Sequence, residues 1–290
     1  MIDNYLLQEL VTFSQTKTLA KTAGQLNVTQ PTVTRGMQKL EADFGVQLFS
    51  RQPNRITLTP TGELAATEAA KLLHASQQLV TTVRNFDQTQ HRLKIGMTIP
   101  GPLLLVTQVT LPPQSTVADR LLPDDELVDQ LTQHKCSLIF SSHAVKTDTI
   151  SSHFIGTEAL SVHLNKFMYQ ANQASVSFSE LKDLSFIVMA DIGPWRSLIQ
   201  QAIPNARFFY QKQRDAFTEI TQYSDFPYFS TTLSLFDADY RAQHAQDDSR
   251  IEIPISDSQA SMPIYACYLT ADRHQVMPLI DQFVAVMPKN

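Results

Sequence analysis

The fold of the N-terminal region follows from residues 18–35, which read TLAKTAGQLNVTQPTVTR. Its first half has apolar side chains at helical spacing and is interrupted at Asn27-Val28, which predicts a short helix followed by a tight turn. Its second half begins after Thr29, an N-cap residue type, and tolerates Pro31 because proline is accepted in the first turn of a helix. Two short helices joined by a tight turn are therefore expected.

The second of these helices has an apolar face and a polar face. Val33, Met37 and Leu40 share the apolar face, which points inward. Glutamine can bind adenine edges, arginine can bind guanine or phosphate, and proline or threonine can touch a thymine methyl group. A solvated helix in any small bundle would show the same periodicity, so the flanking sequence has to decide. The side chains of the polar face, which we predict to contact DNA, are Gln30, Pro31, Thr32, Thr34, Arg35 and Gln38.

The flanking sequence supplies a preceding helix and a following ribbon. An apolar stripe predicts a helix that ends near Thr16, and Gly45 is expected to close the third helix. Residues 48–51 and 56–59 read as two short strands around the turn 52–55. Such a ribbon is a wing, and its arginines are suited to the phosphate backbone or the minor groove. The arginines predicted to bind DNA there are Arg51 and Arg55.

These residues together carry a family resemblance. The positions involved are Phe13, residues 18–35, Leu40-Glu41, Gly45, Leu48-Phe49, Arg51, Leu58-Thr59 and Gly62. The first 62 residues, with this order and spacing, resemble the DNA-binding domain of LysR-type transcriptional regulators. Gly36 departs from the pattern, because the family more often has a long polar residue there. Either a close approach of the DNA backbone requires glycine there, or the helix tolerates it. Since an interior glycine costs only about 1 kcal/mol relative to alanine, we expect tolerance.

A long helix follows this region. Thr59-Pro60 is a plausible N-cap and first helical residue, and no proline or glycine follows Gly62 until after Gln90. Apolar residues recur on this helix at seven-residue intervals, which is typical of a coiled coil, although packing against its own domain is the alternative. In the family that the sequence resembles, this helix pairs two subunits. The residues predicted to dimerise are Ala65, Leu72, Leu79 and Phe86.

The remaining sequence alternates short apolar strands with helical segments, which predicts an α/β fold. The expected strands are 93–97, 136–140, 160–164 and 186–190, and the last helix is expected at 271–286. The resemblance implies two Rossmann-like subdomains, similar to periplasmic binding proteins, around a small-molecule site. The implied domains are an all-α winged helix-turn-helix domain at 1–60, a linker helix at 61–90 and an effector domain at 91–290. Within the effector domain, subdomain I is expected at 91–157 and 266–290, and subdomain II at 158–265.

Ligands of open α/β sheets bind outside the carboxyl ends of the strands. That rule nominates an effector pocket, although ordinary loop chemistry is the alternative for each residue. The segment 98–103 is shorter and more apolar than is usual in the family, and 225–232 has no glycine where the family has a Gly-rich turn. We therefore expect effector recognition to be altered or lost. The nominated pocket residues are Thr98, Ile99, Ser141, Ser142, Gly193, Trp195, Ser230 and Thr231.

Composition and motif content argue against several other classes of protein. The net charge is −5, but residues 1–92 carry +2, so any nucleic acid should bind at the N-terminal end. Two cysteines in apolar contexts, Cys136 and Cys267, favour the cytosol and buried, inert thiols. No apolar run is long enough for a membrane helix, and no Gly-rich phosphate loop follows Gly62. His134, Cys136, His143, His153 and His163 lack the compact spacing of a metal site, and no G-x-S-x-G motif is present.

The sequence therefore predicts a cytoplasmic transcriptional regulator that is not an enzyme and needs no cofactor or metal. Its expected partners are double-stranded DNA, a second copy of itself in a dimer or tetramer, a small-molecule effector and RNA polymerase, with no membrane. A regulator-derived solute-binding or enzymatic module that has lost specific DNA binding is the alternative. For the regulator, the logarithm of the DNA affinity should fall linearly with the logarithm of the salt concentration, whereas the alternative predicts no salt-dependent DNA binding.

Overall fold

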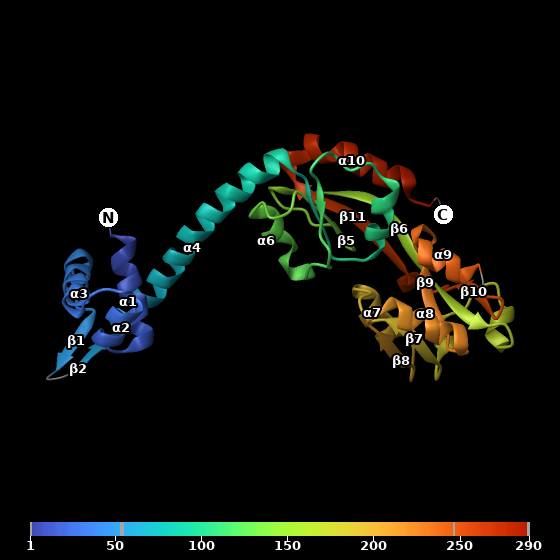
Figure 1. Ribbon diagram of the computed structural model, residues 1–290, viewed down its shortest axis with the longest axis horizontal. Coiled ribbons are helices and arrows are strands. Elements are labelled where there is room, and N and C mark those ends of the chain that lie inside the picture. The colour runs from blue at the N-terminus through green and yellow to red at the C-terminus, as the bar shows by residue number, and fades with distance from the viewer. Residues whose placement is uncertain (1, 53–54, 246, 289–290) are drawn as a thin grey trace. The chain divides into compact units, whose positions relative to one another are not determined.

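Two units of the chain meet within one long helix. The computed structural model describes residues 2–52, 55–245 and 247–288, without the side chains of Gln90, His91 and Gln243 (Figure 1). Contacts divide the chain into Met1–Arg84 and Asn85–Asn290. The boundary falls near the end of α4 (Pro60–His91).

The N-terminal unit is built on three helices, α1 (Asn4–Thr16), α2 (Leu19–Gln25) and α3 (Gln30–Phe44). Asp3 caps α1 by accepting the backbone N–H of Tyr5 at 2.9 Å. The turn between α2 and α3 includes Asn27, whose φ of 55° lies in the left-handed region that asparagine tolerates. The helix-turn-helix predicted from residues 18–35 is therefore confirmed.

The ends of α3 differ in how they are capped. Thr29 occupies the N-cap position, but its hydroxyl lies 2.8 Å from the hydroxyl of Thr32 and makes no capping bond to the backbone. At the other end, Gly45 takes a φ of 70° and donates its N–H to the carbonyl of Glu41, which closes the helix as predicted. The predicted inward residues Val33, Met37 and Leu40 are all buried.

A short antiparallel ribbon follows, formed by β1 (Phe49–Gln52) and β2 (Arg55–Leu58). The ring of Phe49 packs edge-on against that of Phe13 in α1, with centroids 5.6 Å apart, so the ribbon is fixed to the helical core. Pro53 and Asn54, in the predicted wing turn, lie outside the described residues.

The long helix α4 begins as predicted. Its first residue is Pro60, and the hydroxyl of Thr59 accepts the backbone N–H of Gly62 at 3.0 Å. Ala66 and Ala69 are buried in the core of the N-terminal unit, so the first turns of α4 belong to that unit.

A mixed sheet forms the centre of the C-terminal unit. Its strand order is β10-β6-β11-β5-β3-β4, and β9 also pairs with β6. β3 runs parallel to β4 and β5, whereas the pairs made by β6 and β11 are antiparallel. The strands are β3 (Lys94–Met97), β4 (Thr116–Val117), β5 (Leu138–Ser141), β6 (Ile150–Asn165), β9 (Tyr228–Thr231), β10 (Arg250–Pro254) and β11 (Ser261–Leu269), and a separate parallel pair is β7 (Ser185–Met189) with β8 (Arg207–Gln211).

Helices cover this sheet and the separate strand pair. The final helix lies along β6 and β11 and buries Val276, Leu279, Ile280 and Phe283, as its periodicity predicts (Figure 1). The described α-helices of this unit are α5 (Gly101–Leu105), α6 (Leu127–Thr132), α7 (Pro194–Ala202), α8 (Arg214–Tyr223), α9 (Ala238–His244) and α10 (Arg273–Val286).

Two long strands, β6 and β11, pair along the C-terminal unit. Glu158 and Ala266, at the predicted subdomain boundaries, lie within β6 and β11; the division itself stays a prediction. The strand expected at 160–164 is only the last part of β6. The preceding residues 150–159, nine of which pair with β11, were not recognised as strand because several of them are polar. The segment expected to replace a Gly-rich turn contains β9, which pairs with β6.

The predicted fold class, a helical helix-turn-helix domain with a long helix and a C-terminal α/β unit, is confirmed. No helix within the described residues has the length and apolar character needed to cross a membrane.

Candidate functional site

The polar face of α3 is exposed on the N-terminal unit. Gln30, Pro31, Arg35 and Gln38 are exposed, while Thr32 and Thr34 are half-buried. The hydroxyl of Thr34 donates to the carbonyl of Gln30 at 3.1 Å. The structure thus brings the nominated residues of α3 together on one helix, opposite its buried face.

Gly36 is not simply tolerated in α3, as the sequence led us to expect. A Cβ atom at this position would overlap the carboxyl group of Glu9 from α1, chiefly its Oε2 atom. Glu9 is 0% exposed, and neither carboxyl oxygen has a hydrogen-bond partner within the described residues. Burial raises the pKa of Glu9, and the neighbouring hydroxyl of Tyr5 offsets part of this rise. Gly36 therefore makes room for a buried acid between two helices.

The wing is held to α3 by one acidic residue. Oε1 of Glu41 accepts the backbone N–H groups of Leu48 and Phe49, both at 2.9 Å. Oε2 of the same carboxylate lies 2.8 Å from Nη2 of Arg51. Arg51 is therefore paired within the N-terminal unit, whereas Arg55 is exposed on β2 and has no acidic partner among the described residues.

The heptad residues of α4 fall into two groups. Ala65 packs against the core of the N-terminal unit. Leu72, Leu79 and Phe86 are 54%, 65% and 45% exposed, and Val83 between them is exposed too. The ring of Phe86 makes an edge contact with His134, with centroids 5.0 Å apart. An apolar stripe therefore remains on the surface of α4.

A cavity of about 290 Å³ lies in the C-terminal unit, between the segment around α5 and the strands β6, β7 and β9. Most of its lining is apolar and includes Leu104, Leu160, Val188 and Phe229. Arg214 and four acids also line it, and of the acids only Glu158 is fully buried, with 1% exposure; the four are Glu158, Asp191, Asp237 and Asp239. This volume is near the lower end of the range for small-molecule pockets.

Glu158 is a buried acid with one unpaired carboxyl oxygen in this cavity. Its Oε2 atom and the indole N–H of Trp195 lack hydrogen-bond partners within the described residues. Burial raises the pKa of Glu158 to about 7, with the nearby Thr231 and Trp195 offsetting part of the rise. A carboxyl group with this pKa can donate a hydrogen bond when protonated and can accept one when ionised.

Glu158 should make the stability of the C-terminal unit depend on pH. Because its folded pKa is above the unfolded value, its contribution is present at acidic pH and is lost as the pH rises through about 7. We expect the free energy of unfolding to fall by about 1 kcal/mol between pH 6 and pH 8.5 through this group. Thermal melts of the wild type and Glu158→Gln at both pH values test this. Equal losses of stability between the two pH values in the wild type and in Glu158→Gln would contradict it.

Three of the nominated pocket residues line this cavity, namely Trp195, Ser230 and Thr231. The other five are not among its lining residues, and local packing explains why. Thr98 and Ile99 are buried, and a Cβ atom added at Gly193 would lie 3.2 Å from the side chains of Leu121 and Pro100. Ser141 is fully buried with its hydroxyl 3.1 Å from Nδ1 of His143, and Ser142 follows it. The sequence analysis missed several lining residues, among them Glu158, Arg214, Phe217 and Tyr240.

A cluster of polar side chains lies behind the cavity wall. Nε2 of His163 is 2.8 Å from the hydroxyl of Ser230 and 3.2 Å from that of Tyr240. The ring of His163 also stacks on Tyr228, with centroids 4.2 Å apart. Burial, followed by the charge of His244, lowers the pKa of His163 to about 3, so its ring is neutral. Ser230, Tyr240 and Tyr228 all line the cavity as well.

The two cysteines are free and buried, as predicted. Burial raises the pKa of Cys136 to about 11 and also raises that of Cys267. Thiols with raised pKa values are poor nucleophiles at neutral pH.

Comparisons with known proteins agree with the geometry of the N-terminal unit. Residues 5–63 match the family model described as "Bacterial regulatory helix-turn-helix protein, lysR family". The chain is 28% identical over 145 residues to the HTH-type transcriptional regulator YjiE of Escherichia coli (strain K12), a match that covers 49% of this chain and 48% of that protein. It is 33% identical over 91 residues to the regulator GltR of Bacillus subtilis (strain 168), covering 31% of each.

A solved structure shares the fold along the whole chain. It is that of Vibrio fischeri DarR in complex with DNA, with 16% identity, a TM-score of 0.57, and coverage of 99% of this chain and 100% of DarR. The matches to YjiE and GltR, in contrast, span about half and less than a third of those proteins. Residues 5–63 therefore form a helix-turn-helix region of the lysR-family type, and the chain shares the fold of DarR.

Proposed function

We propose that the protein is a sequence-specific DNA-binding transcriptional regulator that acts as a dimer or tetramer and responds to a small molecule. In this proposal residues 1–60 bind DNA, 61–90 dimerise and 91–290 sense the effector. The observation that carries the proposal is the exposed polar face of α3, next to a wing with exposed arginines. A helix with this face has the width and the side chains needed to bind base edges in the major groove.

The salt dependence of DNA binding tests this proposal directly. Binding of the full chain to the DNA upstream of its own gene and to random DNA would be measured across a salt series. We expect specific binding whose logarithmic affinity falls linearly with logarithmic salt, with a slope of about −0.9 per neutralised phosphate. Absence of binding at any salt concentration would instead favour the alternative, a solute-binding or enzymatic module without specific DNA binding.

Two arginines should separate base recognition from phosphate contact. Arg35→Ala is expected to lower affinity for the specific site by about 1–3 kcal/mol and to leave random DNA almost unaffected, because Arg35 lies on the polar face of α3. Arg55→Ala, in the wing, should lower affinity for both DNAs by similar factors. Competition assays with the two DNAs measure both effects. Equal losses of specific and random binding in Arg35→Ala would disprove the assignment of Arg35 to a base.

The cavity is the proposed effector site. Its apolar lining favours a ligand with a largely apolar surface, and the unpaired Oε2 atom of Glu158 favours a polar group that hydrogen-bonds to it. A ligand that binds one arrangement of the two subdomains better than another would change the spacing of the paired α3 helices on DNA. Contact with RNA polymerase would then follow from the altered geometry of the DNA complex.

A further inference from the structure

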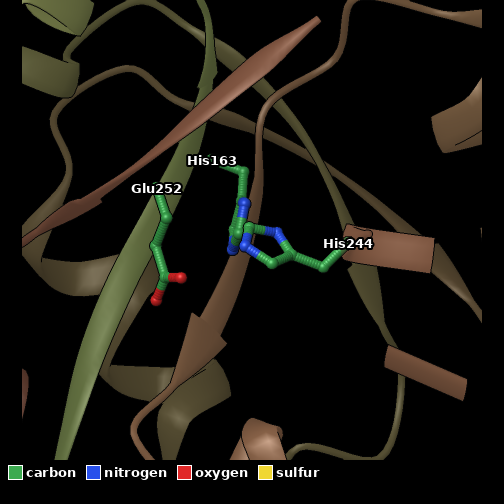
Figure 2. A group of neighbouring side chains, drawn as sticks. All are labelled: His163, His244 and Glu252. Carbon is green, nitrogen blue, oxygen red and sulfur yellow. The ribbon is translucent and has the colours of Figure 1, made fainter. Parts of the chain in front are cut away.

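The structure brings together two histidines and a glutamate that are distant in sequence. Figure 2 shows His163, His244 and Glu252, whose side chains come from β6, α9 and β10. One ligand atom from each residue lies within 4.8 Å of those of the other two. The grouping differs from the set considered in the sequence, in which His163 stood with His134, Cys136, His143 and His153.

Strand pairing explains why two of the three side chains meet. Glu252 and His163 are directly opposite each other in the β10–β6 ladder, so their side chains lie on the same face of the sheet. His244 is the last residue of α9, and its ring makes an edge contact with that of His163, with centroids 5.4 Å apart. Two donors are therefore fixed by the sheet, and the third comes from an exposed helix end.

We propose that His163, His244 and Glu252 bind a divalent transition-metal ion, for which Zn²⁺ is the natural probe. Two imidazoles and one carboxylate are a donor set that zinc uses, with a water molecule as the fourth ligand. Donor atoms around tetrahedral zinc lie about 3.4 Å apart, so the three groups need to approach one another by about an ångström. His244 can supply most of that movement, because its side chain is exposed.

The surroundings of the three residues favour a cation. Among the described residues no lysine or arginine pairs with Glu252. The nearby Arg250 is engaged by Asp247 at 3.0 Å and by the carbonyl oxygens of Ser224 and Phe226. Of the three donors, Glu252 is the one that binds a metal as an anion, so it supplies the charge that attracts a cation.

Two hydroxyl groups are placed to orient the donors. The hydroxyl of Ser230 is 3.2 Å from Oε1 of Glu252, and that of Tyr240 is 3.4 Å from Oε2. Both also contact Nε2 of His163, and a bound metal would displace them from that nitrogen while leaving them hydrogen-bonded to the carboxylate. Ser230 and Tyr240 line the cavity, so metal binding would rearrange one of its walls.

Zinc titration of the untagged, full-length protein tests the proposal. The protein would be freed of metal with a chelator and titrated with ZnCl₂ in competition with a chromophoric zinc chelator. We expect one zinc ion to bind per chain and to raise the thermal transition temperature. His244→Ala and Glu252→Gln should each weaken zinc binding by at least about 10-fold, and Tyr240→Phe, which affects only a supporting hydroxyl, by about 10-fold.

The matched control is His274→Ala, which removes an exposed histidine from α10. It should bind zinc like the wild type. Zinc binding that is absent or not one per chain would overturn the proposal, and so would equal affinities of the wild type, His244→Ala and Glu252→Gln. His163→Ala is avoided, because His163 is buried and its loss could unfold the sheet. These measurements need no DNA, so their outcome is independent of the proposed regulatory function.

Discussion

Leu79→Glu is expected to convert the proposed dimer into monomers and to lower affinity for the specific DNA site by about 10²–10⁴-fold, the range gained when two linked modules bind together. Leu79 is 65% exposed in the middle of the apolar stripe on α4. A glutamate there would place a charge in the proposed interface between subunits, where it would lack a partner. Sedimentation measures the oligomeric state, and DNA titration measures the affinity.

Gln77→Glu is the matched control for this experiment. It adds the same charge two residues away on the same helix, at an exposed position outside the apolar stripe. Gln77→Glu should leave both the oligomeric state and the DNA affinity unchanged. A Leu79→Glu protein that still sediments as a dimer would show that the stripe is not the interface.

Gly36→Ala is expected to destabilise the N-terminal unit by about 1–3 kcal/mol, which is the usual cost of overpacking. The added methyl group would overlap the carboxyl group of Glu9, and this carboxyl is enclosed between α1 and α3. Hydrogen exchange of peptides from α1 and α3 in the full-length protein measures this loss as reduced protection, independently of the C-terminal unit.

Two variants make the Gly36 experiment decisive. Gly24→Ala changes the same residue type within α2, where nothing lies within 4 Å of the new Cβ atom, so it should be neutral or stabilising by up to about 1 kcal/mol. In a Glu9→Ala background the overlap is removed, and the additional cost of Gly36→Ala should fall by more than half. If Gly36→Ala proves as harmless as Gly24→Ala, the packing of Glu9 against α3 is not what selects glycine.

The N-terminal unit could be predicted because its information is local. The apolar residues Val33, Met37 and Leu40 recur at helical spacing, and Gly45 marks the end of the same helix. The role of Gly36 could not be predicted in this way. It depends on Glu9, which lies in another helix and looks in the sequence like an ordinary surface acid.

The cavity was harder to predict because the strands that form it are far apart in sequence. Its buried acid, Glu158, lies within a strand and not at a strand end, so the rule that ligands bind beyond strand ends did not nominate it. The rule did nominate Ser230 and Thr231, which lie at the end of β9. It also nominated Ser141, whose strand end is covered by local hydrogen bonding to His143.

The pairing of His163 with Glu252 could not be predicted either, because it also depends on strands that are far apart in sequence. The two residues meet only because β6 and β10 adopt one particular register, and a shift of one residue would turn their side chains to opposite faces. No periodicity in either segment encodes that register.

The antiparallel ladder between β6 and β11 is long but not regular. It is interrupted once, where Ile264 faces Gly156 and Tyr265 faces Phe154, which leaves Ile155 without an opposite residue. Such a bulge increases the local twist and bends the strand. Paired strands continue on both sides of the bulge, so any movement between the two proposed subdomains would twist these strands. If the proposed effector binds, we expect small changes that reverse when it dissociates.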